Sequence, residues 1–285
     1  ISYVNKLGTV SVGNSNPVRI MGILNTSPES FYKKSISIGK KRIADSVRRM
    51  EEDGADFVDV GGMSTAPYLS TMVSEKTETH RIIKAVKIIQ QVSNLPISID
   101  TCRAGVAKKS LEFGVDIIND VTGLKYDPMM SKIIEKYCPS LVLCAFSKKF
   151  TTGNQLLKTK NLLKESLSIA KSAGIPSSKI VLDPAIGFFR KEGKGSLFTK
   201  INSDWVKRDL LILKNLKSIK MNKPILVSVS NKSFIGKILK KQHLADRLAG
   251  TLVAEMVSVL NGADIIRTHN VGKTKEVITT TQKLS

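Results

Sequence analysis

Five segments of this sequence share one pattern: a short apolar run that ends in a polar residue able to do chemistry. In Val181-Leu-Asp-Pro-Ala-Ile-Gly-Phe188 the run stops at Asp183 and is followed by proline and glycine, which predicts a buried strand that emerges into a loop. The polar residues that close the five runs are Asn25, Asp100, Asn119 with Asp120, Asp183, and Arg267 with His269. Their repetition at successive strand ends predicts one shared site at the C-terminal mouth of a parallel barrel.

The residues at these run ends divide by the chemistry that they can do. Asp183 and Asn119 offer paired acceptors and donors, which suit the amide-like edge of a flat heterocycle. Arg267, His269 and Asn25 are donors, which suit an anion such as diphosphate. Taken singly, an Asp or Asn at a strand end commonly caps a loop or the next helix, so only the set carries the prediction.

Two further polar residues follow predicted strands. Lys232 lies in Ser230-Asn-Lys-Ser233, at a place where barrels often hold a phosphate, and Thr65 follows the glycine pair at 61–62. No Ser-His-Asp or Cys-His arrangement is evident in the sequence. We therefore expect a site that binds its substrates and stabilises charge, not one that forms a covalent intermediate.

Eight strand–helix units are predicted to position these residues. The predicted strands cover residues 19–24, 57–60, 96–99, 115–118, 141–146, 179–182, 225–229 and 263–267. The predicted helices are one that ends near Gly54, then 75–93, 103–113, 128–137, 156–173, 203–220, 246–261 and 272–284. Eight units in a chain of this size match an α/β fold of the (β/α)8 TIM-barrel type. A doubly wound sheet, the alternative, rarely needs eight repeats, and no Gly-x-Gly-x-x-Gly follows the first strand.

The segment before the first strand has a pattern of its own. Residues 3–13 predict two short strands about a turn at Gly8, and 14–17 predict a turn. We expect a hairpin that closes the bottom of the barrel. The whole chain, 1–285, is then one domain in which 1–18 form the N-terminal hairpin and turn.

The composition is strongly basic, with 45 Lys and Arg against 24 Asp and Glu and a net charge of +21. Nucleic-acid binding is disfavoured because the basic residues are scattered in pairs and aromatic residues make up only 5% of the chain. A phosphorylated small substrate is the alternative explanation of the positive charge.

No apolar run is long enough for a membrane span. Cys102, Cys138 and Cys144 lack the spacing of a zinc site and predict reduced thiols in a cytoplasmic protein.

Seven segments resemble, in order, the signatures of the dihydropteroate synthase family. They are Met21-Gly-Ile-Leu-Asn-Thr-Ser-Pro-Glu-Ser-Phe31, Val58-Asp-Val-Gly-Gly-Met-Ser-Thr-Ala-Pro67, Ser98-Ile-Asp-Thr101, Ile118-Asn-Asp-Val121, Leu182-Asp-Pro-Ala-Ile-Gly-Phe188, Ser230-Asn-Lys-Ser-Phe-Ile-Gly236 and Arg267-Thr-His269. The resemblance spans about residues 19–270. It implies a pterin-binding (β/α)8 barrel that joins 6-hydroxymethyl-7,8-dihydropterin diphosphate to p-aminobenzoate and releases diphosphate, in folate biosynthesis.

The resemblance also implies roles for individual residues. Those that would hold the pterin are Asp100, Asn119, Asp183 and Lys232, with Asp100 and Lys232 at the catalytic centre. Those that would hold the diphosphate are Asn25, Arg267 and His269, with Asn25 near Mg²⁺. Those that would line the arylamine side are Thr65, Pro67 and Ser233. The loops 25–37 and 61–74 would close over the reacting atoms.

The arylamine side departs from the family pattern. Ala66 and Asn231 each stand where the family usually has arginine. Two cations are therefore missing from the side that meets the carboxylate of p-aminobenzoate. The sequence leaves open whether Lys33, Lys34 or Arg190 replaces them.

Three interpretations remain open. The first is a dihydropteroate synthase with an altered arylamine pocket. The second is a related synthase whose arylamine lacks a carboxylate, such as the ribofuranosyl-aminobenzene phosphate of the methanopterin pathway. The third is a pterin-binding domain without this activity, such as one that presents methyl-pterin to a corrinoid partner; it would not need Arg267 and His269. The helix predicted at 246–261 has more apolar positions than one face needs, so we expect a homodimer.

Overall fold

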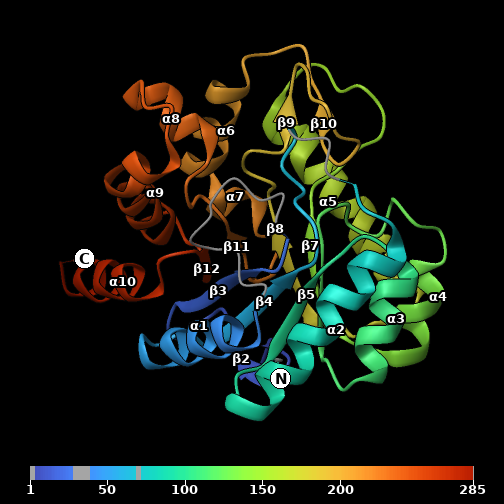
Figure 1. Ribbon diagram of the computed structural model, residues 1–285. Coiled ribbons are helices and arrows are strands. Elements are labelled where there is room, and N and C mark those ends of the chain that lie inside the picture. Colours follow the sequence, from blue (N-terminus) through green and yellow to red (C-terminus); the bar gives the residue numbers. More distant parts are fainter. Residues whose placement is uncertain (1–3, 28–38, 69–71, 285) are drawn as a thin grey trace.

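Eight parallel strands form one curled sheet in the computed structural model, which describes residues 4–27, 39–68 and 72–284 (Figure 1). The strands are β3 (Arg19–Asn25), β4 (Phe57–Gly61), β5 (Ile97–Asp100), β6 (Ile117–Asp120), β7 (Ser140–Cys144), β8 (Ile180–Asp183), β11 (Leu226–Val227) and β12 (Ile265–Thr268). Their order in the sheet is β11-β12-β3-β4-β5-β6-β7-β8. A parallel bridge between Leu182 and Ile225 links the two end strands. The predicted barrel is therefore confirmed.

Helices lie outside the barrel and cover the strands (Figure 1). In the described part of the chain they are α1 (Lys40–Glu52), α2 (Glu75–Val92), α3 (Ala104–Glu112), α4 (Met130–Tyr137), α5 (Gln155–Ser172), α6 (Trp205–Lys214), α7 (Leu216–Ile219), α8 (Ser233–Leu239), α9 (Leu248–Leu260) and α10 (Val271–Leu284), with short 3₁₀ turns at Ser177–Lys179 and Leu244–Arg247. Most follow the expected amphipathic pattern. In α1, for example, Ile43 and Ala44 are buried, and so is Val47 about one turn later. No helix in the described ranges is long and apolar enough to cross a membrane.

Two layers of apolar residues hold this arrangement together. The larger layer fills the space between the strands and the helices. The smaller one lies inside the barrel, where alternate residues of the strands point inward. Its strand members are Met21, Phe57, Ile117, Val142, Val181, Leu226 and Ile265.

The N-terminal hairpin closes this inner layer. Strands β1 (Lys6–Leu7) and β2 (Val10–Ser11) pair antiparallel, as predicted. Leu7 and Val12 are fully buried among the inward-pointing strand residues. The turn between the two strands places Gly8 at φ +57° with its N–H donating to Ser140 Oγ at 3.0 Å. The bottom of the barrel is thus plugged, and the opposite end remains for a site.

Three features were not predicted from the sequence. The helix expected at 203–220 is divided at Asn215, whose side chain donates to the carbonyl of Leu211 at 2.7 Å. The short helix α8 begins at Ser233, in the connection that follows the seventh strand, β11. After β8, the strands β9 (Phe189–Arg190) and β10 (Thr199–Lys200) form a small parallel pair beside the mouth of the barrel.

Candidate functional site

A cavity opens at the C-terminal end of the barrel. Its wall includes eight of the predicted site residues, namely Asn25, Thr65, Pro67, Asp100, Lys232, Ser233, Arg267 and His269. They come from the ends of β3, β4, β5, β11 and β12 and from the loops that follow them. These strands are parallel, so their ends meet on one side, and the predicted convergence is found.

Asn119 and Asp183 are buried at the ends of β6 and β8 and do not line the cavity in this structure. Asn119 donates to Asp59 Oδ2 at 3.1 Å. Asp183 accepts the N–H of Ala185 at 2.7 Å, and burial raises the pKa of its carboxyl group. Asn119 and Asp183, two of the four predicted pterin-binding residues, are therefore behind the cavity wall and already hydrogen-bonded to protein groups.

Asp59 is a site residue that was not singled out from the sequence. It is fully buried on β4, and its Oδ2 atom accepts from Arg267 Nε at 2.7 Å as well as from Asn119. Arg267 also donates from Nη2 to Asp100 Oδ2 at 2.9 Å. One buried carboxylate thus orients a guanidinium and an amide at the mouth of the barrel.

This cluster sets the charges of its members. Burial raises the pKa of Asp100 to about 7, although the positive charge of Arg267 opposes the shift. Burial alone would lower the pKa of Arg267, but Asp59 and Asp100 outweigh that effect and raise it. Arg267 is therefore a permanent cation, whereas Asp100 can hold or release a proton near neutral pH.

Lys232 and His269 lie on the same wall, and their pKa values are lowered, whereas those of Asp100 and Arg267 are raised. Loss of bulk water and the positive charge of Arg267 lower the pKa of Lys232 to about 8. The same two causes lower the pKa of His269 to about 3, so its ring is neutral at pH 7. Nδ1 of His269 and Oγ of Ser230 are 2.9 Å apart. A bound anion would relieve this crowding of positive charge, which makes the wall a suitable receptor for one.

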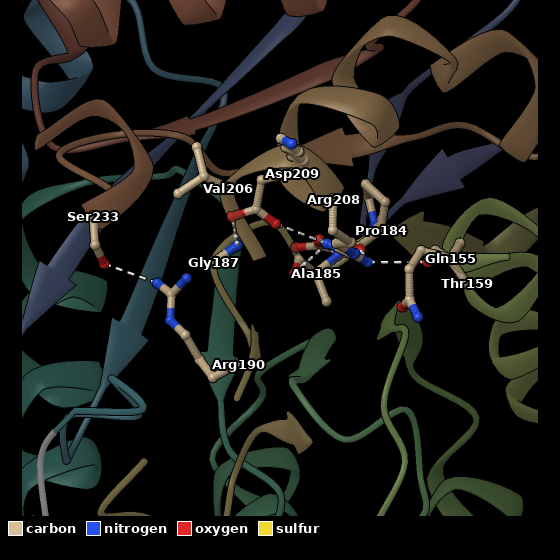
Figure 2. Close-up of polar contacts among 12 residues, drawn as sticks. Gln155, Thr159, Pro184, Ala185, Gly187, Arg190, Val206, Arg208, Asp209 and Ser233 are labelled. Carbon is tan, nitrogen blue, oxygen red and sulfur yellow. Dashed lines mark hydrogen bonds and ion pairs between the residues drawn. The ribbon is translucent and has the colours of Figure 1, made fainter. Parts of the chain in front are cut away.

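A buried ion pair fixes the loop after β8 (Figure 2). Arg208, on α6, is 1% exposed and donates to the carbonyls of Pro184 at 2.7 Å and Ala185 at 3.1 Å. It pairs with Asp209 at 3.0 Å, and the second oxygen of Asp209 accepts the N–H of Gly187 at 3.1 Å. The loop that leads from Asp183 into β9 is therefore held from behind by α6.

Arg190 ends this loop and points toward the start of α8 (Figure 2). Its Nη2 atom donates to Ser233 Oγ at 2.8 Å, and its guanidinium stacks on Trp205 at 3.7 Å from the ring centroid. Arg190 lines the cavity together with Phe188. Lys33 and Lys34, the other two candidates for a replacement cation, lie outside the described residues.

Asn231 is on the same wall and is held to α9 and its preceding turn. Its backbone is left-handed, with φ at 57°. Its N–H donates to Thr251 Oγ1 at 3.0 Å, and its carbonyl accepts from Arg247 Nη1 at 3.0 Å. The position that carries arginine in the family pattern is thus occupied by a neutral, buried side chain.

The loop after β4 forms the opposite wall. Thr65, Ala66 and Pro67 line the cavity, and the carbonyl of Pro67 accepts the N–H of Lys194 at 2.8 Å. The segment between β9 and β10 therefore supports this wall. The expected closing loops, 25–37 and 61–74, fall partly outside the described residues, which exclude 28–38 and 69–71.

A magnesium ion fits this site only if the protein and a bound diphosphate coordinate it together. No group of three or more His, Cys, Asp or Glu residues able to hold a metal occurs within the described ranges. Asn25 supplies a side-chain oxygen on the wall that also carries Arg267 and His269. Because Mg²⁺ commonly takes one or two protein oxygens and completes its shell with phosphate oxygens and water, this donor set is compatible with a metal that arrives with a diphosphate.

Comparisons with known proteins identify the family of this chain. A family model described as "Pterin binding enzyme" matches residues 21–269. The chain is 34% identical over 274 residues to the dihydropteroate synthase of Clostridium beijerinckii, which covers 93% of this chain and 94% of that protein. It is similar to the structure of the Clostridium difficile dihydropteroate synthase in the presence of pteroic acid, with a TM-score of 0.82 and 32% identity over 94% of this chain and 97% of that one. It is also similar to the Xanthomonas albilineans dihydropteroate synthase with 4-aminobenzoic acid, with a TM-score of 0.81 and 25% identity over 94% and 93% of the two chains.

Proposed function

Because this chain belongs to the pterin-binding enzyme family, we propose that it joins 6-hydroxymethyl-7,8-dihydropterin diphosphate to p-aminobenzoate and releases diphosphate. This is the transferase reaction of dihydropteroate synthase in folate biosynthesis. The observation that carries the proposal is the arrangement of the cavity wall. It brings a carboxyl group, Asp100, within 2.9 Å of a permanent cation, Arg267, with the neutral His269 on the same wall.

The proposed reaction requires one bond to break and one to form, and the residues of the cavity wall can stabilise the charge that this produces. The bond between the pterin methylene carbon and the diphosphate oxygen breaks, the arylamine nitrogen bonds to that carbon, and the nitrogen then releases a proton. An arylamine is nucleophilic without a strong base, so the main requirement is to stabilise charge on the leaving diphosphate. The donors proposed for it are Asn25, Arg267 and His269. Mg²⁺, held by Asn25 and the diphosphate, would neutralise part of the same charge.

The pterin is proposed to bind along the ends of β5, β6 and β8. Asp100 lines the cavity, whereas Asn119 and Asp183 would have to turn from their present protein partners to meet the heterocycle. Lys232 lies above Phe188 with Nζ at 4.3 Å from the ring centroid. Asp100 and Lys232 are the proposed catalytic pair. The pKa of each group is shifted toward neutral pH, so either group can donate a proton to the pterin ring or accept one from it during the reaction.

The arylamine is proposed to enter between the loop after β4 and the start of α8. Thr65 and Pro67 form one side and Ser233 the other. This placement leaves the amine facing the pterin and its far end facing Arg190. The alternative of a domain that only presents methyl-pterin to a partner is disfavoured, because that role needs no diphosphate donors such as Arg267 and His269.

A homodimer is proposed through α9 and α10. An apolar groove between these helices is lined by Leu252, Val253, Met256, Leu260, Val277 and Leu284. Val253 is 57% exposed and Leu284 is 84% exposed, which is unusual for apolar residues that share one surface. Light scattering of the purified protein would test this, with Val253→Lys as the disrupting variant.

The cysteines Cys102, Cys138 and Cys144 are free thiols, as is usual in the cytoplasm, where we place the reaction.

The first experiment is to measure diphosphate release from the pterin diphosphate with Mg²⁺. p-Aminobenzoate and ribofuranosyl-aminobenzene phosphate are supplied in parallel, with Lys232→Ala as the inactive variant and the exposed Lys237→Ala as its matched control. Release with p-aminobenzoate that Lys232→Ala abolishes and Lys237→Ala retains is the expected result. Release only with the ribosylated amine would replace the proposed substrate. Tight pterin binding without release from either amine would refute the synthase activity.

A further inference from the structure

Arg190 carries a donor with no partner on the arylamine side of the cavity. Its side chain is 7% exposed. Nη2 donates to Ser233 Oγ at 2.8 Å, whereas the buried Nη1 has no hydrogen-bond partner among the described residues. Buried guanidinium donors are normally satisfied, because an unmade hydrogen bond to a charged group is costly. Because Arg190 lines the cavity, a ligand atom bound there is a suitable partner for this unsatisfied donor.

The charge of Arg190 is offset only in part, by the carboxylate of Asp209. None of the ion pairs found within the described ranges involves it. The carboxylate of Asp209 is already taken, with one oxygen 3.0 Å from Arg208 and the other accepting Gly187 N–H at 3.1 Å. Burial lowers the pKa of Arg190, yet an arginine stays protonated at neutral pH. The cavity therefore contains a buried cation that awaits an anion.

The guanidinium is held in place before any ligand arrives. It stacks on Trp205 at 3.7 Å, and β9, which carries it, pairs with β10 through Arg190 and Lys200. The loop that precedes β9 is fixed by Arg208 and Asp209 (Figure 2). A side chain that is ordered in advance loses little freedom on binding, which favours its use as a specificity contact.

We infer that Arg190 is the residue that receives the carboxylate of the arylamine substrate. This inference rests on the proposed function and names the chemical class of its second substrate, a monoanionic arylcarboxylate. One carboxylate oxygen would accept from Nη1 of Arg190 and the other from the hydroxyl of Ser233, whose Oγ already lies 2.8 Å from Nη2. Ala66 and Asn231 are neutral residues that line the same cavity, so Arg190 takes over the charge that the family pattern places at those positions.

The amount of charge on this wall distinguishes a carboxylate from a phosphate. One guanidinium with one free amino group and one hydroxyl matches a planar monoanion. A phosphate ester dianion has three acceptor oxygens and commonly requires more than one cation. Lys232 also lines the cavity next to Ser233, but it is assigned to the pterin, so Arg190 is the cation left for the arylamine and the arrangement favours p-aminobenzoate over a phosphorylated amine.

The test compares an acid and its neutral isostere as second substrates. kcat and KM are measured for p-aminobenzoate and for 4-aminobenzamide with the wild type, Arg190→Gln and Arg190→Lys. The matched control is Lys191→Gln, an exposed cation next in sequence. Binding of the pterin diphosphate is measured separately for each variant by titration calorimetry, and thermal unfolding verifies that each variant is folded.

Arg190→Gln is expected to raise KM for p-aminobenzoate by about 10- to 100-fold, which is the usual effect of losing one charged hydrogen bond. It should change KM for 4-aminobenzamide by less than about threefold, because the amide carries no charge to match. Arg190→Lys should lie between the two, since the charge is kept and the fork is lost. Lys191→Gln should leave KM for both amines unchanged, and every variant should keep the wild-type affinity for the pterin diphosphate.

Two outcomes would overturn this inference alone. One is a wild-type preference for the acid over the amide that Arg190→Gln leaves intact, and the other is an equal loss for both amines, which would mark a structural role. A wild type that turns over only the ribosylated phosphate would also exclude it. If the wild type releases diphosphate with none of these amines, the proposed function fails, and the inference fails with it for that distinct reason.

Discussion

Arg267 and Asp59 form a buried ion pair, with Nε of the arginine 2.7 Å from Oδ2 of the aspartate. The pair spans the strand β3, since the two residues lie on β12 and β4, its two neighbours. The same aspartate oxygen accepts from Asn119 at 3.1 Å. One carboxylate that faces no solvent therefore aligns a donor proposed for the diphosphate with an amide proposed for the pterin.

Asp59→Asn is expected to weaken both stability and substrate binding. Removing one partner of a buried ion pair commonly costs about 3–5 kcal/mol. Because Arg267 keeps its second partner, Asp100, at 2.9 Å, the loss here should lie at the lower end of that range. Urea unfolding would measure the loss in the free energy of unfolding, and calorimetry the loss of affinity for the pterin diphosphate. The control is Asp45→Asn, whose partner Arg48 lies 3.7 Å away on the exposed face of α1; it should cost less than about 0.5 kcal/mol. Equal effects of the two substitutions would contradict the role given to Asp59.

Binding of the pterin diphosphate should depend on pH through Lys232. Its pKa is about 8 in the free protein, lowered by loss of bulk water and by Arg267 and raised in turn by Asp183. The ammonium is charged below this value, so affinity should stay level up to about pH 8 and fall above it as the proton is lost. Lys232→Arg should move the fall to higher pH because arginine stays charged. An unchanged pH profile in that variant would show that another group titrates.

Glu255 should make stability depend on pH without affecting the site. It is fully buried on α9, where Oε2 accepts from Thr274 Oγ1 at 2.8 Å. Burial raises its pKa to about 7, so the folded state holds a proton that the unfolded chain releases at lower pH. The stability from this group is present below the unfolded pKa and decreases as the pH rises toward 7. Relative to Glu255→Gln, the wild type should lose about 2 kcal/mol between pH 5 and pH 8, as read from urea unfolding. A constant difference between the two proteins would contradict the shifted pKa.

The ion pair between Arg208 and Asp209 should show strong coupling in a double-mutant cycle. Arg208→Met leaves a buried carboxylate and frees two loop carbonyls, so we expect a loss of about 3–5 kcal/mol in the free energy of unfolding. Arg208→Met combined with Asp209→Leu should cost clearly less than the sum of the single losses, because no charge is left unpaired. Additive losses would show that the two residues act independently.

Gly193→Ala should impair the arylamine wall and spare the pterin side. A β-carbon at this position would lie 2.7 Å from the carbonyl of Pro67 and 2.6 Å from the ring of Phe198. The contact would displace Pro67, so KM for the arylamine should rise about threefold or more while the affinity for the pterin diphosphate stays the same. The isosteric change Glu192→Gln, at an exposed position in the same segment, is the control. A parallel loss on the pterin side would point to a wider distortion.

The barrel and most of the cavity wall were predictable from the sequence because their signals are local. Each buried strand is a short apolar run, and each run ends in a polar residue that the parallel topology brings to the same mouth. Asn25, Asp100 and Arg267 were found in this way, and all three line the cavity. The N-terminal hairpin followed from a turn at Gly8, whose positive φ confirms the turn.

The remaining features depend on contacts between distant segments. Asp59 lies within the run Phe57-Val-Asp-Val60, where a lone carboxylate in an apolar strand was the available signal. Arg208 and Asp209 look like part of an exposed helix face, and only the fold places them behind the loop after β8. The contact of Arg190 with Ser233 joins residues 43 positions apart. Neither helical nor strand periodicity can report such a pairing.

The left-handed backbone of Asn231 limits how this protein could change in future. An arginine introduced there would have to adopt a φ near 57°, which disfavours residues with a β-carbon by about 1–2 kcal/mol. Thr251 and Arg247 hold the backbone in that conformation. The new cation would also meet the charge of Arg190 on the same wall. Restoring arginine at position 231 alone would therefore carry a backbone cost and place a second guanidinium in the cavity that Arg190 already lines.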